Sequence, residues 1–151
     1  MDRQAIRHVL DRYYAALNGH DRDRLAGVVA GDVVFDDDMV PDIVFHGADE
    51  FLGVFDGMWY AFPDLRLEVL RGPFFVVVVD DDDDDGAAQC AVHGRLTGTL
   101  ANAVPDWGFT RVGATLNQEY MAVYEVAGDR MSYIRACLNP AILASQVGSA
   151  N

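Results

Sequence analysis

The sequence of 151 residues contains no lysine, because all 11 of its basic residues are arginine. This absence excludes Schiff-base catalysis, lysine-linked cofactors and the lysine of a phosphate-binding loop. Acidic residues number 24, so the formal net charge is −13. A surface of this sign repels phosphate backbones and anionic lipid, and we therefore expect no nucleic acid and no membrane as a partner.

Cysteine is almost as scarce, and long apolar runs are missing. Cys90 and Cys137 each lie in an apolar stretch, which predicts two buried, reduced thiols in a cytoplasmic protein. No cysteines and histidines have the spacing of a zinc site, and no nucleotide-binding motif occurs, so we expect no metal and no cofactor. The charged N-terminus lacks a signal-peptide core, and no stretch approaches the length of a membrane span.

The apolar residues that are present suffice for one domain, residues 1–151, since they make up 51% of the chain. Three- and four-residue apolar steps predict helices at residues 4–18, 22–29 and 47–62. Alternating or continuous apolar patterns predict strands at 33–37, 65–70, 74–79, 89–99, 115–126 and 131–138, before a closing helical turn at 139–147. The predicted fold class is α+β: three N-terminal helices packed on a curved antiparallel sheet, a cone-shaped barrel that encloses a pocket.

Six consecutive aspartates, Asp80–Asp85, lie between two of the predicted strands. Such a charge run is typical of a solvated hairpin tip. Weak calcium binding is the functional alternative, although a bare run specifies no ligand geometry.

The first candidates for chemistry are Asp37 and the pair Tyr13 and Tyr14. Alternation places Phe35 and Asp37 on one face of their strand, so Asp37 faces the cone interior if Phe35 faces the core. Burial there would raise the pKa of the carboxyl toward the range of a general base, whereas a solvated acidic loop is the alternative. One of the two tyrosines lies near the apolar stripe of its helix, where a phenol either donates to an oxyanion or only packs in the core.

Two further candidates have equally plain structural alternatives. His93 is either an acid/base group or a structural residue of its strand. Asp64 follows a helix-stopping proline and is either an acid at the mouth of the cone or a turn residue.

The parity of strand 115–126 decides which of its polar residues reach the pocket. If the even positions face inward, Gln118 and Tyr120 do so and Glu119 is solvated, and we favour this parity. The reverse parity makes Glu119 the candidate acid. The side chains expected to bind the substrate are Tyr14, Phe35, Phe55, Trp59, Phe62, Gln118 and Leu138.

Three segments of the chain resemble the SnoaL-like polyketide cyclases, a branch of the nuclear transport factor 2-like superfamily. VLDRYYAALNGHDRDRLAGVVAGDVVFDD (residues 9–37) resembles the family's opening helix, acidic turn and first strand. WYAFPDLRLEVL (59–70) resembles its helix end and second strand, and GDRMSYIRACLNPAILASQVG (128–148) its closing hairpin and tail. The resemblance covers nearly the whole chain and implies the cone-shaped fold and a homodimer.

The resemblance also implies roles for single residues. In the similar ketosteroid isomerases, Tyr13 falls on the position of the oxyanion-binding tyrosine and Asp37 on that of the proton-shuttling aspartate. The isomerases' second oxyanion donor has its closest match in Tyr120. Similar epoxide hydrolases use an acid at the Asp37 position with a second acid near Asp64. The aldol-type cyclases keep their acid on the last strand, where this chain has Ala136, and this leaves Asp37 as the best base.

We therefore hypothesise a cofactor-independent cyclase or isomerase that acts on a hydrophobic, polyketide-like small molecule. Asp37 would remove a proton, and Tyr13, with Tyr120 or His93, would stabilise the oxyanion. Epoxide opening, with Asp64 or Glu119 as the acid, is the second hypothesis. A non-catalytic binding or dimerisation module is the third, and it predicts an exposed Asp37 and a pocket filled by side chains.

Overall fold

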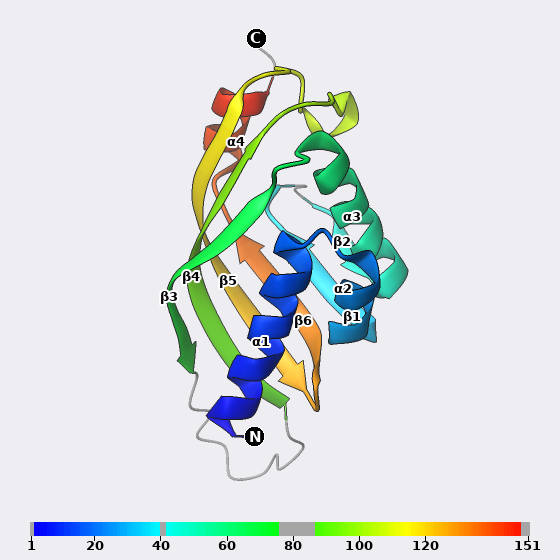
Figure 1. Ribbon diagram of the computed structural model, residues 1–151, viewed down its shortest axis with the longest axis vertical. Coiled ribbons are helices and arrows are strands. Elements are labelled where there is room, and N and C mark those ends of the chain that lie inside the picture. The colour runs from blue at the N-terminus through cyan, green and yellow to red at the C-terminus, as the bar shows by residue number, and fades with distance from the viewer. Residues whose placement is uncertain (1, 40–41, 76–86, 149–151) are drawn as a thin grey trace.

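The structure, a computed structural model, describes residues 2–39, 42–75 and 87–148 (Figure 1). The elements are α1 (Arg3–Asn18), α2 (Arg22–Val28), β1 (Val29–Asp37), β2 (Val44–His46), α3 (Ala48–Ala61), β3 (Arg66–Phe75), β4 (Ala87–Thr99), the 3-10 turn η1 (Pro105–Trp107), β5 (Thr115–Ala127), β6 (Arg130–Cys137) and α4 (Pro140–Val147). The α+β class and the three N-terminal helices are confirmed. The aspartate run Asp80–Asp85 lies outside the described residues.

Six strands form one sheet in the order β2-β1-β6-β5-β4-β3. Neighbouring strands are antiparallel except for β1 and β6, which run parallel with Asp36 opposite Arg135 and Asp37 opposite Ala136. The expectation of a wholly antiparallel sheet is therefore wrong at this pair. Alternation within one strand reports which face is buried, and it carries no signal for the partner strand or its direction.

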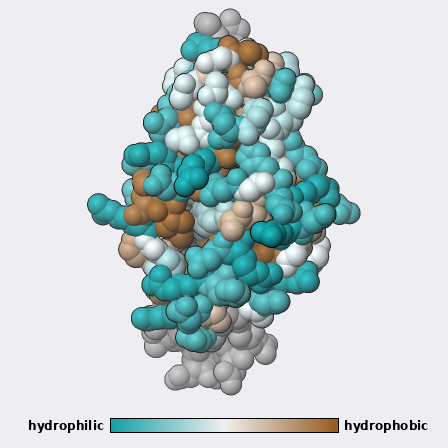
Figure 2. All heavy atoms as spheres, in the orientation of Figure 1, coloured by the Kyte–Doolittle hydropathy of each residue, from teal (hydrophilic) through white to brown (hydrophobic). Residues whose placement is uncertain are grey.

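The sheet curves around α1, which crosses its concave side with α2 and α3 next to it (Figure 1). The buried residues of α1 form the stripe that the sequence predicts: Ile6, Val9, Leu10, Tyr13, Tyr14, Ala16 and Leu17. Hydrophilic residues cover most of the outer surface of these helices in the same view (Figure 2). The core therefore lies inside the cone, between the helices and the concave face of the sheet.

Local signals set several element boundaries. The side chain of Asp21 caps α2, as predicted, by accepting a hydrogen bond of 3.0 Å from the backbone N–H of Arg24. α3 ends at Ala61, two residues before Pro63, which cannot continue a helix. Gly128 takes a φ of +64° in the two-residue turn between β5 and β6, and this confirms the predicted hairpin.

Three local expectations differ from the structure. β1 begins at Val29 rather than at residue 33, and its register against β6 shifts between Val29 and Val34. The predicted strands 65–70 and 74–79 are, as far as Phe75, a single strand, β3. The three-residue elements β2 and η1 were not predicted, because elements this short leave no periodic pattern.

The two cysteines differ in exposure. Cys90 is buried on the inner face of β4, as expected, but Cys137 is exposed at the end of β6. The prediction of two buried thiols is therefore wrong for Cys137. No helix among the described residues has both the length and the apolar character needed to cross a bilayer.

Candidate active site

An apolar pocket lies inside the cone, between α1, α3 and the concave face of the sheet. Twelve of its sixteen lining residues are apolar, and the other four are Tyr13, Asp37, Tyr120 and Tyr124. The volume of the cavity is about 50 Å³. Small-molecule sites commonly measure about 300–1,000 Å³. The pocket is therefore narrow, with room for a few water molecules or for the slim end of a ligand.

β1 delivers Asp37 to this pocket. Phe35 and Asp37 alternate with Val34 and Asp36 along the strand, so both Phe35 and Asp37 turn inward, and Asp37 is only 6% exposed. The Oδ1 atom of Asp37 accepts a hydrogen bond of 2.7 Å from the backbone N–H of Met39. Its Oδ2 atom has no hydrogen-bond partner among the described residues. One carboxylate oxygen is thus anchored, and the other is available to a ligand.

The surroundings of Asp37 change its acidity. Burial raises the pKa of Asp37 from its ordinary value of 3.8 to about 6. The N–H of Met39 and the charge of Arg135 lower this pKa, whereas the charges of Asp38 and Asp36 raise it. A carboxyl with a pKa near 6 is mostly ionised at neutral pH, and it still accepts and returns protons readily.

Four buried tyrosines gather around the pocket. The Tyr14 hydroxyl shares hydrogen bonds with the hydroxyls of Tyr120, at 2.9 Å, and Tyr124, at 2.7 Å. The Tyr13 ring packs edge-on against Tyr14 and Tyr124, with centroids 5.5 and 5.6 Å apart. Burial raises the pKa of all four phenols above the ordinary value of 10.0, and the charge of Asp37 adds to the increase at Tyr13. Each phenol therefore stays protonated and able to donate a hydrogen bond.

The position of Tyr120 depends on its cross-strand partner, Gly94. A Cβ atom added at Gly94 would overlap the Tyr120 ring near its hydroxyl. Because glycine has no Cβ, the ring can lie across β4 and reach Tyr14.

Phe35, Phe55 and Leu138 line the pocket, as the sequence predicts. Tyr14 does not, although its hydroxyl supports two residues that do. The even positions of β5 are buried and Glu119 is exposed, so the favoured parity is confirmed.

Trp59, Phe62 and Gln118 were expected to line the pocket, and they do not line this cavity, although Gln118 lines an open hollow beside Tyr120 and Leu138. Trp59 stacks on the imidazole of His20, with centroids 5.4 Å apart, and Phe62 packs edge-on against Phe109 at 5.3 Å. The side-chain amide of Gln118 donates a hydrogen bond of 3.0 Å to a backbone carbonyl just before α4. An apolar stripe or a strand parity predicts burial, but it does not distinguish the pocket wall from the rest of the core.

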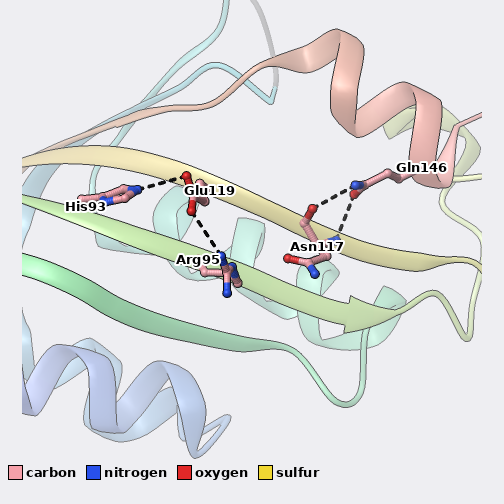
Figure 3. Close-up of polar contacts among 5 residues, drawn as sticks. All are labelled: His93, Arg95, Asn117, Glu119 and Gln146. Carbon is pink, nitrogen blue, oxygen red and sulfur yellow. Dashed lines mark hydrogen bonds and ion pairs between the residues drawn. The ribbon is translucent and has the colours of Figure 1, made fainter.

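His93 lies on the outer face of the sheet, away from the pocket. Its Nε2 atom is 3.3 Å from one carboxylate oxygen of Glu119, and Arg95 is 3.2 Å from the other, so that the three side chains form a row across β4 and β5 (Figure 3). These partners, His93 foremost, lower the pKa of Glu119. The acid/base role proposed for His93 in the pocket is therefore contradicted, and the structural reading fits.

Asp64 also lies outside the pocket. It is exposed, and its Oδ1 atom accepts a hydrogen bond of 2.7 Å from the backbone N–H of Thr99. This is the turn role rather than the catalytic one. Asp37 is thus the one carboxylate lining the pocket in the described part of the chain. Within that part, no three His, Cys, Asp or Glu side chains are grouped to hold a metal ion.

Ten of the sixteen lining residues received no pocket role from the sequence, and Tyr124 and Ala136 are the two of them that bear most on Asp37 and the tyrosines. Tyr124 shares the even parity of Tyr120 on β5, and this signal was sufficient to place it on the inner face. Ala136 lies opposite Asp37 in the parallel pair of β1 and β6. The position at which aldol-type cyclases were expected to carry their acid is therefore next to Asp37 in space, on the neighbouring strand.

Comparisons with known proteins agree with this architecture. The family model described as a SnoaL-like domain matches residues 10–134. A candidate SnoaL-like polyketide cyclase from Jannaschia sp. CCS1 superposes with a TM-score of 0.76 at 14% identity, over 100% of this chain and 99% of that one. An NTF2-like protein from Burkholderia xenovorans LB400 gives a TM-score of 0.67 at 15% identity, over 98% and 99% of the two chains.

A third similar structure is AclR, a candidate hydroxylase from Streptomyces galilaeus, with a TM-score of 0.68 at 17% identity over 92% of this chain and 81% of that one. At such identities these likenesses show the fold alone. A search among curated protein sequences finds no match. The family model, which spans most of the chain, shows the relationship: the chain belongs to the SnoaL-like domain family.

Proposed function

We propose that this protein is a cyclase or isomerase that moves a proton on a small apolar carbonyl compound without a cofactor. The observation that carries the proposal is the setting of Asp37. Its carboxylate is buried at one end of an apolar pocket, its Oδ2 atom has no partner among the described residues, and its pKa is raised to about 6. A structural aspartate is normally exposed or paired, so this setting fits a general base.

The proposed acid/base roles follow from the protonation states of two groups in one pocket, the carboxyl of Asp37 and the phenol of Tyr13. Asp37 is ionised at neutral pH and accepts a proton from the carbon next to the substrate carbonyl. The electrons of that C–H bond move onto the carbonyl oxygen, and the Tyr13 hydroxyl donates a hydrogen bond to the resulting enolate. The protonated Asp37 then returns the proton to another carbon of the enolate. In a cyclisation, the enolate carbon instead bonds to a second carbonyl carbon, the π electrons of that carbonyl move onto its oxygen, and this oxygen takes the proton from Asp37.

The tyrosine group offers a second hydrogen-bond donor. The hydroxyls of Tyr14, Tyr120 and Tyr124 carry three protons, and their two mutual hydrogen bonds use two of them. Which O–H remains depends on the direction of these bonds. When Tyr14 donates to Tyr120, the O–H of Tyr120 is left for a ligand, and Tyr120 lines the pocket, whereas Tyr14 does not. In that arrangement Tyr120 takes the role that the resemblance gave to it.

The pocket also limits the substrate. A volume of about 50 Å³ does not hold a polycyclic body. We propose that the reacting end of a polyketide-like molecule enters between Asp37 and Tyr13. A wider substrate requires movement of flexible wall residues such as Met39 and Met58.

A non-catalytic binding role is the second candidate, and the narrow volume favours it. Epoxide opening has less support, because it needs a second acid. Asp64 and Glu119, the two acids proposed for that step, both lie outside the pocket.

The test compares wild type with Asp37→Asn and with Glu119→Gln, which removes a carboxylate from the other face of the sheet. A thermal-shift screen against small β-dicarbonyl compounds, enones and hydroxy-epoxides identifies ligands. Proton NMR in D2O then follows exchange of the acidic C–H and the formation of products. We expect wild type and Glu119→Gln to exchange the proton, and Asp37→Asn to bind the ligand but to lose about 100-fold or more of the rate.

Two results would contradict the proposal. If wild type binds a ligand without exchange or conversion, the binding role replaces the catalytic one. If Asp37→Asn keeps the wild-type rate, Asp37 is not the base.

A further inference from the structure

Arg135 lies directly behind Asp37, on the outer side of the sheet. It is on β6, in register with Asp36 in the parallel pairing, while its neighbour Ala136 is in register with Asp37. Because successive side chains of a strand point to opposite faces, Ala136 lines the pocket and Arg135 points to the other face of the sheet. The Arg135 side chain keeps about a third of its surface exposed, at 32%.

The guanidinium of Arg135 joins the two acids that flank Asp37. Its Nη1 atom is 2.7 Å from the Oδ1 atom of Asp36, and its Nη2 atom is 2.8 Å from the Oδ1 atom of Asp38. The two planar N–H donors thus bridge residues on either side of Asp37 in the sequence. The acidic run Asp36–Asp38 is therefore divided by direction: two carboxylates turn outward to one arginine, and the third turns into the pocket.

We propose that Arg135 is a positioning residue for Asp37: it fixes the end of β1 and balances the two outward carboxylates, so that Asp37 alone enters the pocket as a charged base. The proposal rests on the function proposed above and adds a residue that lies outside the pocket. The carboxylates of Asp36 and Asp38 oppose ionisation of Asp37, and the guanidinium favours it.

In the described part of the chain, no other element around Asp37, β2 included, supplies a cation that lowers its pKa. From α1 comes the phenol of Tyr13, which stays protonated. From β5 come the phenols of Tyr120 and Tyr124, and α3 contributes apolar side chains. Among the described residues that surround the pocket and the end of β1, Arg135 is thus the cation that acts on Asp37.

The experiment measures the titration of Asp37 directly, from its side-chain carboxyl signal in carbon-13 NMR, identified by its loss in Asp37→Asn. The variant is Arg135→Gln, and the matched control is Arg95→Gln, an arginine that pairs with one exposed carboxylate on the same outer face. We expect Arg135→Gln to move the Asp37 midpoint upward by about 1 pH unit, because removing a nearby cation disfavours the charged carboxylate. Arg95→Gln should leave it unchanged.

A second pair of variants keeps the test decisive if Arg135→Gln fails to fold because it leaves Asp36 and Asp38 unpaired. Asp36→Asn/Asp38→Asn is compared with the same variant carrying Arg135→Gln as well. Adding Arg135→Gln should raise the Asp37 midpoint, because the two variants differ only in the charge of Arg135. Equal midpoints with and without Arg135 would overturn the proposal.

The readout also separates this proposal from the function on which it rests. The NMR midpoint needs no substrate, so it reports on Arg135 even if no reaction is found. When a substrate is known, the pH–rate profile of Arg135→Gln should shift upward by the same amount. A midpoint that shifts without any reaction would leave the positioning role standing and remove the catalytic one.

Discussion

Asp37 and Glu119 are carboxylates on strands of the same sheet, and they lie on its two opposite faces. Asp37 is buried inside the cone, where loss of hydration raises its pKa to about 6. Glu119 is exposed on the outer face, where hydrogen bonding to His93, followed by Arg95, lowers its pKa. The inner carboxylate has a free oxygen among the described residues and an apolar wall, whereas both oxygens of the outer one are paired.

The difference between the two shows what makes an acid available for chemistry in this fold. Both side chains are carboxylic acids, and their hydrogen-bond and charge partners differ. On the outer face, histidine and arginine satisfy the carboxylate and water screens it, so it behaves as a surface ion pair of small energy. On the inner face, water is excluded and the balancing arginine stands on the far side of the strand. Four predictions test this contrast between the faces, through activity and through stability.

The largest effect is expected from removing the hydroxyl of Tyr13, which lines the pocket. Tyr13→Phe removes one O–H from the pocket wall and keeps the ring packing. If Tyr13 is the oxyanion donor, kcat should fall by about 100–1,000-fold with little change in stability. Tyr60→Phe is the matched control, because Tyr60 is 58% exposed and lies outside the pocket. Equal rates for the two variants would show that the inner phenol does not act on the substrate.

A second prediction concerns how stability depends on pH. The pKa of Asp37 is raised on folding, so its stabilising contribution is present below the ordinary value of 3.8 and is lost as pH rises through about 6. This difference corresponds to about 3 kcal/mol. Relative to wild type, Asp37→Asn should therefore gain up to about 3 kcal/mol in free energy of unfolding between pH ~4 and pH ~7, measured by urea denaturation.

Glu119→Gln should change the pH dependence of stability in the direction opposite to that of Asp37→Asn. The pKa of Glu119 is lowered on folding, so the carboxylate stabilises the protein above its ordinary value of 4.5, and that contribution is lost as pH falls. Relative to wild type, Glu119→Gln should lose a little stability as pH rises. If the free energies of unfolding of Asp37→Asn and Glu119→Gln, each relative to wild type, changed with pH in the same direction, the contrast between the two faces would be contradicted.

The residues of β5 and β6 show how far sequence patterns reach. Alternation predicted that Tyr120 is inward and Glu119 outward, because a strand has a fixed period of two. The same pattern contained no information on the parallel pairing of β1 with β6, which joins segments about a hundred residues apart. The sequence therefore did not predict that Arg135 lies beside Asp36 and Asp38.

The candidate site shows the same limit. Asp37 and Tyr13 were predicted from a strand parity, a helical stripe and a family resemblance, and the structure places both in one pocket. His93 and Trp59 were expected there because strand and helix patterns mark apolar surroundings. The alternation of β4, which buries Cys90 and Val92, would have placed His93 on the outer face, and this parity was not used. The position of Trp59 depends on packing against His20, which no local pattern encodes.

Adding one methyl group to the inner face tests how tightly the pocket wall is packed. A Cβ at Gly94 overlaps the Tyr120 ring, so Gly94→Ala should cost about 1–3 kcal/mol through overpacking and should displace the Tyr120 hydroxyl from Tyr14. Gly27→Ala is the control: nothing lies within 4 Å of its added Cβ in the last turn of α2, so this change should not destabilise the protein. Urea denaturation measures both. If Gly94→Ala is as stable as wild type and keeps its ligand affinity, the side chains of the inner wall can move apart. The pocket can then open beyond its volume of about 50 Å³.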